Sequence, residues 1–398
     1  MGKKVLYISG SLGLGHVFRD LAIVKELRKL KPDIDLYWLA EHPVTDLLTE
    51  AGEKVLPESY SVSNELMKKQ VDEKNQVNFT RWLYAWSKFF DRTFQDYMNI
   101  LQRENFDLVI GDEAYELAIG YSKKPELLDR HFVMMWDFVK VYPMTKNPID
   151  HIIAWVVNQN WDRHYKMKET PYLHNIFFGE LEDTPDESLG LFLVNARDWG
   201  KKYCDFVGHP LQFDPKQYTD PAFLKERLGY GRDPLILCAI GGTSAGAGLL
   251  GLCKRAYPIM RRALPNARMV IVGGPSIQLG SEATPDGLEI RGYVPKLYEH
   301  FAACDLAIVL GGGGTTLELA ALHKPFIYFP LEKHSEQMIS VARTLDRYSA
   351  GNKMLFSRTS PEMLAEKAIS CIGQKVEYGN IPTDGALRSA EIISKLIQ

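Results

Sequence analysis

Short apolar runs alternate with helical patterns along the first half of the chain. Residues 5–8 are apolar throughout, as in a buried strand, and residues 16–30 place apolar side chains at helical spacing. Further strands are expected at residues 36–39, 107–110, 131–136 and 191–194. Strands that alternate with helices predict parallel βαβ units with helices on both faces of a sheet.

A second α/β series follows a stretch rich in proline after Gly208. Proline restricts its own backbone and that of the preceding residue, which is typical of a linker. Strands are then expected at residues 235–240, 267–272, 306–310 and 326–329, with a closing helix at 386–397. Because 398 residues exceed what one core usually holds, we predict an α/β protein with an N-terminal domain over 1–205, a C-terminal domain over 206–385 and a final helix over 386–398.

Composition narrows the class of protein. The net charge of -3 and the absence of basic runs argue against a nucleic-acid partner. Five widely spaced cysteines without a C-x-x-C predict neither a disulfide framework nor a zinc site, so we expect a cytoplasmic protein. The sequence contains no run of about 18 apolar residues, so no membrane-spanning helix is predicted. The sequence leaves open a peripheral contact with the inner face of a membrane, and it does not predict the oligomeric state.

The first glycine-containing loop leads to a histidine. Its glycines, Gly10, Gly13 and Gly15, fit neither the dinucleotide-binding G-x-G-x-x-G pattern nor a Walker A loop. His16 follows at the expected turn from strand to helix. It is either a residue that caps the helix or a general base, since imidazole titrates near neutral pH.

Glycines in the second half also follow expected strands. Gly241, Gly242 and Thr243 form a turn whose N–H groups and hydroxyl suit an oxyanion, although such turns are also common without a ligand. Four consecutive glycines, residues 311–314, are costly in conformational entropy, so the backbone there is expected to approach a ligand closely. These turns together favour a phosphorylated ligand at helix N-termini.

Polar residues beyond the glycine run extend this candidate site. Glu318 lies about one turn into the next helix, where its carboxylate can accept both hydroxyls of a ribose or simply favour the helix dipole. Glu336 and Gln337 follow another strand and can bond a polyhydroxylated ligand or belong to a solvated helix start. No metal site is predicted, because the only D-x-D sequence, at residues 33–35, lies in an expected turn.

Four segments in order resemble the GT-B glycosyltransferases of the MurG and UDP-glycosyltransferase superfamily. Residues 13–18 resemble the MurG-type Gly-Gly-His-Val-Phe loop, and 241–243 resemble the phosphate loop that opens the donor domain. Residues 291–295 resemble the base-binding Gly-Trp-Val-Pro segment, and 311–337 resemble the donor signature. The resemblance implies two Rossmann-like domains facing across a cleft, with the last helix crossing back to the first domain.

The resemblance also implies roles for single residues. His16 would be the catalytic base and Asp112 its partner, as in plant-type members, with Gly13 and Gly15 in the acceptor-side loop. The donor, a UDP-sugar such as UDP-N-acetylglucosamine, would contact residues of the second domain: Gly241, Gly242, Thr243, Tyr293, Val294, Gly312, Gly313, Gly314, Thr315, Thr316, Glu318, Glu336 and Gln337. Transfer would be inverting and metal-independent, with the UDP-sugar as co-substrate and no other cofactor.

Two other functions stay open at this point. A UDP-sugar 2-epimerase shares the architecture, and a non-catalytic nucleotide-sugar-binding subunit is favoured by Leu310, which stands where many relatives carry a histidine. The acceptor is not identified. Aromatic residues along 79–101 and 152–161 are either core or the lining of a lipid or apolar acceptor site.

Overall fold

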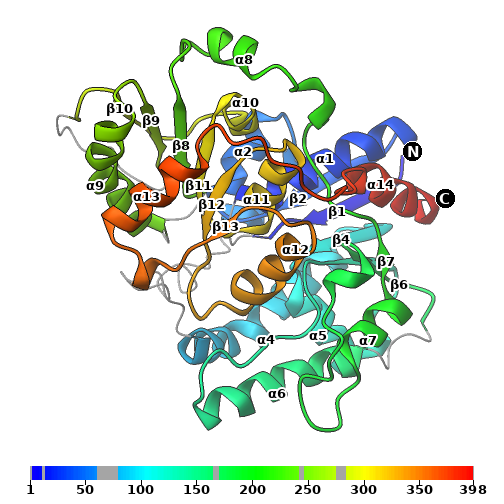
Figure 1. The fold of residues 1–398 in the computed structure, drawn as a ribbon. Coiled ribbons are helices and arrows are strands. Elements are labelled where there is room, and N and C mark those ends of the chain that lie inside the picture. Colours follow the sequence, from blue (N-terminus) through cyan, green and yellow to red (C-terminus); the bar gives the residue numbers. More distant parts are fainter. Residues whose placement is uncertain are drawn as a thin grey trace. The chain divides into compact units, whose positions relative to one another are not determined.

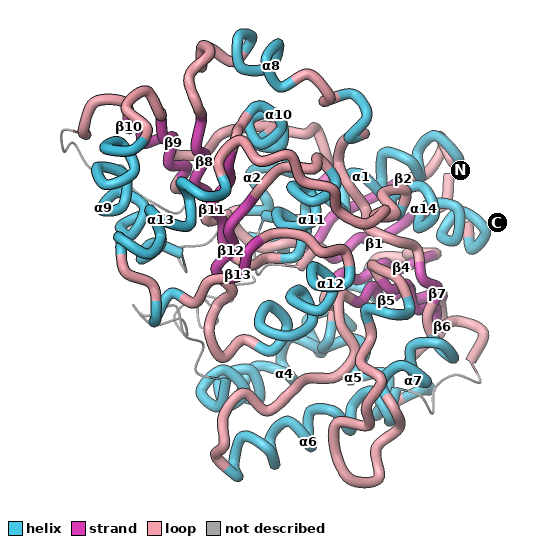
Figure 2. Tube along the Cα trace, in the orientation of Figure 1, coloured by secondary structure: helices cyan, strands magenta, loops and turns pink. Residues whose placement is uncertain are grey.

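The fold was analysed in a computed structural model, which describes residues 2–10, 14–60, 79–164, 170–241, 246–274 and 284–397, with only the backbone for 79–88 and 164. The described residues form two compact units (Figures 1 and 2). Of the described residues, those up to 212 and 382–397 form the first unit, and residues 213–381 form the second.

The first unit is a parallel sheet covered by helices. Its strands lie in the order β3-β2-β1-β4-β5-β6-β7, and every neighbouring pair is parallel. The strands are β1 (Lys4–Ile8), β2 (Asp35–Leu39), β3 (Lys54–Val55), β4 (Leu108–Asp112), β5 (His131–Trp136), β6 (Leu173–Phe177) and β7 (Asp205–Phe206). The helices are α1 (Leu14–Leu30), α2 (Val44–Glu50), α4 (Phe79–Arg103), α5 (Tyr115–Lys123), α6 (Pro148–His164), α7 (Ala196–Tyr203) and α14 (Gly385–Leu396).

Both faces of this sheet are buried, which explains why its central strands are apolar throughout. Along β1, Leu6 and Ile8 pack on one side with α4, α5, α6 and α7, while Val5 and Tyr7 pack on the other side with α1, α2 and α14. The last helix therefore belongs to the first unit, where α14 packs along α1 (Figure 1).

The second unit repeats the plan with another parallel sheet, in the order β10-β9-β8-β11-β12-β13. Its strands are β8 (Leu235–Ala239), β9 (Arg268–Val272), β10 (Leu288–Arg291), β11 (Leu306–Leu310), β12 (Phe326–Phe329) and β13 (Asn352–Lys353). Its helices are α8 (Pro221–Arg227), α9 (Ala247–Ala263), α10 (Leu297–Ala303), α11 (Gly313–Ala321), α12 (Ala342–Arg347) and α13 (Pro361–Cys371). One face packs against α9 and α13 and the other against α8, α10, α11 and α12.

The two sheets reverse strand order at equivalent places. In the first unit the order reverses between β1 and β4, and in the second between β8 and β11. Ligands of open parallel sheets bind outside the carboxyl ends of the strands at such a reversal. Each unit therefore has one position at which its own fold favours a ligand.

Two predictions along the chain need correction. Residues 191–194 are a turn and loop rather than a strand, because Leu191 and Phe192 are exposed and Phe192 has a positive φ of 63°. The first unit runs past residue 205 because β7 pairs with β6 and because the His209 N–H donates to the carbonyl of Pro382, 2.8 Å away.

The aromatic stripe of α4 is core where its side chains are described, since Phe90, Phe94, Met98 and Leu101 are buried. None of the described helices is long and apolar enough to cross a membrane.

Candidate active site

His16 and Asp112 meet at the strand reversal of the first unit. His16 lies in the first turn of α1, just after β1, and Asp112 is the last residue of the neighbouring strand β4. The two side chains approach to 2.9 Å between His16 Nδ1 and Asp112 Oδ2. Gly10 leaves them room, because a Cβ atom at that position would lie 3.2 Å from His16 Nδ1.

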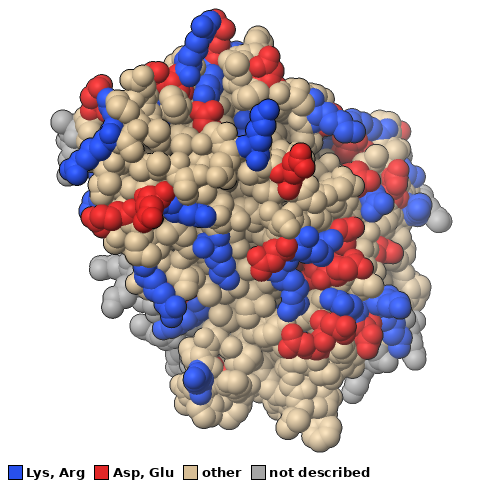
Figure 3. All heavy atoms as spheres, viewed as in Figure 1, with Lys and Arg blue, Asp and Glu red and all other residues tan. Residues whose placement is uncertain are grey.

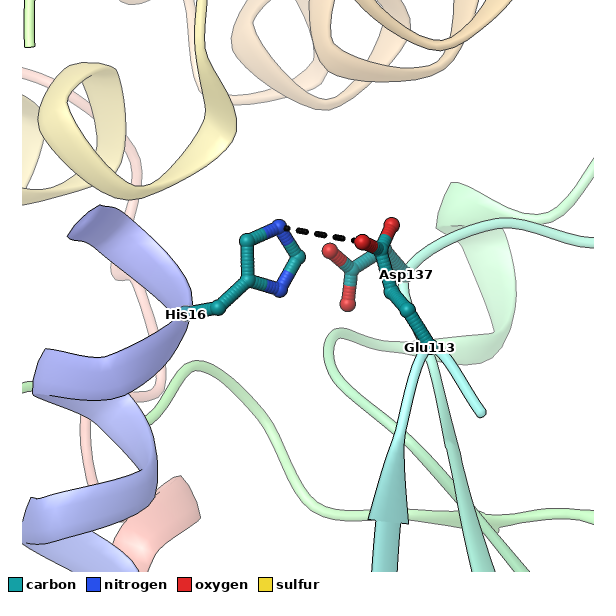
Figure 4. A group of neighbouring side chains, drawn as sticks. All are labelled: His16, Glu113 and Asp137. Carbon is teal, nitrogen blue, oxygen red and sulfur yellow. Dashed lines mark ion pairs between the residues drawn. The ribbon is translucent and has the colours of Figure 1, made fainter. Parts of the chain in front are cut away.

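Three charged residues that the sequence analysis did not single out complete this cluster: Arg19, Glu113 and Asp137. Arg19 lies one turn after His16 on α1, Glu113 follows β4, and Asp137 follows the adjacent strand β5. The sequence held signals for all three. Arg19 is three residues after His16 and so shares its helix face, and Glu113 and Asp137 follow parallel strands that end at the same edge of the sheet. Figure 4 shows the side chains of His16, Glu113 and Asp137 pointing toward one another.

The contacts of this cluster are mainly ion pairs. Arg19 bonds both carboxylate oxygens of Asp112, at 2.5 and 3.1 Å, and Asp137 Oδ2 at 2.8 Å. On the other side of the imidazole ring, His16 Nε2 lies 3.6 Å from Glu113 Oε2. His16 therefore has a carboxylate near each of its two ring nitrogens.

A buried polar layer lies beneath the cluster. Tyr7 donates a 2.8 Å hydrogen bond to Asp20 Oδ1, and Ser9 donates one of 2.5 Å to Asp20 Oδ2. Burial and the nearby charge of Asp112 raise the pKa of Asp20 well above its ordinary value. The negative charge of the site is thus concentrated on the three carboxylates around His16 and Arg19.

The charges also set the protonation of His16 and Asp112. Burial lowers the pKa of His16, but the negative charges of Glu113 and Asp112 outweigh burial and the charge of Arg19 and raise that pKa to about 10. Burial opposes ionisation of Asp112, yet Arg19 and His16 hold the pKa of this carboxyl well below its ordinary value. Without substrate, the pair is an imidazolium facing a carboxylate at neutral pH.

The side chains of His16, Glu113 and Asp137 are also of types that bind metal ions. Their closest donor atoms all lie within 4.8 Å of one another, the one such group found among the described residues. Asp137 already pairs with the guanidinium of Arg19, whose positive charge disfavours a second cation. We therefore interpret the group as an ion-pair cluster suited to moving a proton.

The strand reversal of the second unit presents bare backbone instead of charged side chains. Gly241 follows β8 with a positive φ of 78°, and residues 242–243, the predicted Gly242 and Thr243, lie outside the described part of the chain. After β11, Gly311 is needed for packing, because a Cβ there would lie 2.7 Å from Pro330 Cα. Gly312 differs, since a Cβ there would meet no atom within 4 Å, so packing among the described residues does not require a glycine at this position.

Helix α11 starts at the glycine run, with Gly312 as its N-cap. Gly313 and Gly314 form its first turn, whose free N–H groups favour an anion. Thr315 and Glu318 are partly exposed, whereas Thr316 is fully buried and its hydroxyl donates to the carbonyls of Gly312 (2.9 Å) and Gly313 (3.2 Å). In this structure the predicted ligand residue Thr316 therefore directs its hydroxyl at the main chain.

The other predicted donor residues lie on two further segments of the second unit. Tyr293 is exposed just after β10, and the neighbouring Val294 packs partly into the core. Glu336 and Gln337 open the π-helical turn Glu336–Val341, a geometry that is frequent at functional sites. Gln337 Oε1 accepts a 2.9 Å bond from the Leu331 N–H, which fixes the amide and leaves its NH₂ group to face elsewhere.

The acceptor-side glycines are only partly described. Gly13 lies outside the described residues. Gly15 lies on α1, and a Cβ at this position would meet nothing within 4 Å. Gly15 is therefore not required by packing within the described part of the chain.

Comparison with known proteins addresses the class of the enzyme. The Glycosyltransferase family 28 C-terminal domain matches residues 269–378, which carry β9 to β13 and the glycine run. An uncharacterized glycosyltransferase of Methanosarcina acetivorans is 23% identical over 95% of this chain and 89% of its own length. These similarities indicate a glycosyltransferase in which residues 269–378 form a family 28 C-terminal domain.

Two further comparisons relate this chain to named proteins. An UDP-N-acetylglucosamine--N-acetylmuramyl-(pentapeptide) pyrophosphoryl-undecaprenol N-acetylglucosamine transferase of Carboxydothermus hydrogenoformans is 30% identical, over 28% of this chain and 32% of its own. The solved structure of the glycotransferase of kitacinnamycin covers all of both chains with a TM-score of 0.65 at 14% identity. The latter likeness supports the two-unit α/β fold of this glycosyltransferase.

Proposed function

We propose that this glycosyltransferase moves a sugar from a UDP-sugar to an acceptor hydroxyl with inversion at the anomeric carbon and without a metal ion. The contact between His16 and Asp112 carries this proposal, because it places a histidine, oriented by a carboxylate, where the fold of the first unit favours a ligand. His16 would take the proton of the acceptor hydroxyl as its oxygen attacks the sugar. The base form requires loss of the proton that Glu113 and Asp112 hold on His16.

The second unit would bind the donor. The free N–H groups of the first turn of α11 would hold the diphosphate, and the positive end of the helix would stabilise UDP as it leaves. The open space at Gly312 supports this assignment. Glu318 would bind the ribose, Glu336 and Gln337 the sugar hydroxyls, and Val294 with Tyr293 the uracil. The name of the Carboxydothermus hydrogenoformans relative favours UDP-N-acetylglucosamine as the first sugar donor to test.

An exposed apolar patch favours an apolar acceptor reached from a membrane surface. Helix α6 exposes Ile149, Ile152, Trp155 and Val156, and the Trp155 indole N–H donates a 3.1 Å bond to the carbonyl of Leu191. This bond ties the helix to the turn that presents Phe192 with its side chain fully exposed. In Figure 3 the lowest part of the face shown, where α6 lies in Figure 1, carries few charged side chains.

The charges beside this patch suit an anionic lipid surface. Lys146 is exposed in the same segment, and the only carboxylate between residues 146 and 156, that of Asp150, is half-buried and bonded to Thr145. The protein should co-sediment with phosphatidylglycerol vesicles, and Phe192→Asp should abolish this binding to the vesicles. Phe223→Asp, an exposed phenylalanine on α8, is the matched control, and equal effects of the two variants would contradict a specific patch.

The first test of the proposed function is calorimetric titration with UDP, GDP, dTDP and UDP-sugars, followed by product analysis. We expect binding confined to uridine nucleotides, and transfer of the sugar when an acceptor screen uses the sugar that binds. A UDP-sugar converted to its 2-epimer without acceptor would indicate an isomerase instead. Binding without transfer, hydrolysis or epimerisation would indicate a binding subunit, and no nucleotide binding would contradict the donor site.

A further inference from the structure

Arg19 contacts several side chains of the candidate active site, and the catalytic proposal gives it no role. Its guanidinium bonds Asp112 through two nitrogens and Asp137 through the third, and it stacks at 4.5 Å on the ring of Phe178. A planar fork of donors can hold two carboxylates in fixed directions, which a lysine ammonium cannot do. Arg19 therefore sets the orientation of Asp112, the partner of His16.

Arg19 also contacts His16 directly, at the nitrogen that Asp112 occupies. Arg19 Nη2 lies 2.7 Å and Asp112 Oδ2 lies 2.9 Å from His16 Nδ1. One ring nitrogen cannot donate to a carboxylate and accept from a guanidinium at the same time. If Nδ1 carries the hydrogen it bonds Asp112, and Nε2 of a neutral ring is then free to accept a proton. If Nδ1 accepts from Arg19, a neutral ring carries its hydrogen on Nε2.

We propose that Arg19 is a positioning residue for His16. Arg19 holds Asp112 in place and competes with Asp112 for the Nδ1 atom of His16, so that the imidazole is not held permanently as an imidazolium. The proposal rests on the proposed role of His16 as the base. It adds that the proton affinity and the tautomer of this base are set by competition between a carboxylate and a guanidinium.

The charges that face His16 give the direction of the effect. Asp112 and Glu113 approach from the end of β4, Asp137 from the end of β5, and Arg19 and Asp20 from α1. Arg19 is the one cation among these five groups, and its charge lowers the pKa of His16 against the carboxylates. Removing that charge should therefore make His16 harder to deprotonate.

Nitrogen NMR of ¹⁵N-histidine-labelled protein tests this without any substrate. The signal of His16 is assigned by its loss in His16→Gln, and the titration is recorded in Glu113→Gln and in Arg19→Gln/Glu113→Gln. The shared Glu113→Gln change brings the midpoint toward an accessible pH. We expect the added Arg19→Gln change to move the midpoint upward by about one pH unit or more. An unchanged midpoint and tautomer would overturn the proposal.

Arg19→Lys separates charge from geometry and also serves if Arg19→Gln does not fold. Because the lysine keeps a positive charge, the midpoint of the His16 titration should move by less than about half a pH unit. Because it loses the planar fork of donors, kcat for UDP release from UDP-N-acetylglucosamine should fall at least tenfold at unchanged KM. Wild-type kcat in Arg19→Lys would overturn the positioning role. The proposed role of His16 as the base is tested separately by His16→Ala. An active His16→Ala enzyme would contradict the role of His16 as the base. An inactive His16→Ala enzyme together with an unaffected Arg19 variant would contradict only the role of Arg19.

Discussion

The strand reversals of the two units share a topology and differ in chemistry. At the reversal of the first unit, between β1 and β4, three carboxylates lie around His16 and Arg19. At the reversal of the second unit, glycines follow β8 and β11, and the proposed ligand-binding groups are backbone N–H groups at the start of α11. The same arrangement of strands thus supports a site rich in ionisable groups and a site made mainly of main chain.

The difference follows from what each unit would have to do. Moving a proton requires a side chain that titrates, held by neighbours that tune its pKa, and the first unit supplies five charged groups within one cluster. Holding a diphosphate requires uncharged donors that a large anion can approach closely, and glycine provides them without a side chain in the way. We expect variants in the first unit to change rate and its pH dependence, and variants in the second to change donor affinity.

The largest expected effect is that of His16→Ala. Loss of the base should reduce turnover by roughly 10²–10⁴-fold, because a positioned general base typically contributes that much. UDP affinity, measured by calorimetry, should stay within about twofold, because the proposed donor groups lie in the other unit. Turnover close to that of the wild type would contradict the role of His16 as the base. A loss of UDP affinity in His16→Ala would contradict the assignment of catalysis to the first unit and donor binding to the second.

A matched pair of glycine variants tests the second site. Gly312→Ala should keep the wild-type melting temperature, because its methyl group meets no atom within 4 Å, but should weaken UDP binding about tenfold, or about 1.4 kcal/mol, by intruding on the diphosphate. Gly311→Ala should instead destabilise the protein by about 1–3 kcal/mol through collision with Pro330. The comparison fails if Gly312→Ala binds UDP as tightly as the wild type.

The sequence allowed the architecture to be predicted because both sheets consist of short apolar strands separated by glycine turns. Residues 131–136, 306–310 and 326–329 are strands at the expected bounds. The errors lie where local pattern is weak. Strand β7 has only two residues, and the apolar residues 191–194 resemble a buried strand although tertiary packing leaves Leu191 and Phe192 exposed.

The candidate site could be predicted only in part. His16 and Asp112 were expected as partners through a family resemblance, and the structure brings them to 2.9 Å. Arg19, Glu113 and Asp137 were missed because each looks like an ordinary solvated charge until the order of β1, β4 and β5 places all three at one edge. Thr316 was expected at the ligand through the same resemblance, but the helical turn directs its hydroxyl back to Gly312 and Gly313.

The pH dependence of turnover tests how the charged cluster tunes its base. Because a base must be deprotonated and the pKa of His16 is raised to about 10, turnover should increase across pH 7 to 9, by about tenfold per pH unit. Glu113→Gln removes the largest charge that raises this pKa, so the inflection of the pH–rate profile should move toward neutral pH. A wild-type inflection near pH 6.5 that Glu113→Gln leaves in place would show that the carboxylates do not control His16.

The smallest expected effect is that of metal removal. If the N-terminus of α11 stabilises the leaving diphosphate and Arg19 already pairs with Asp112 and Asp137, no step of the proposed reaction needs a divalent cation. Dialysis against EDTA should therefore change turnover by less than about twofold, which initial rates before and after dialysis would measure. A loss of tenfold or more that Mn²⁺ or Mg²⁺ restores would contradict the metal-independent reaction. Asp137→Asn would then locate the requirement, since this change alters the first unit alone, and an EDTA effect that persists in it would point to the diphosphate side.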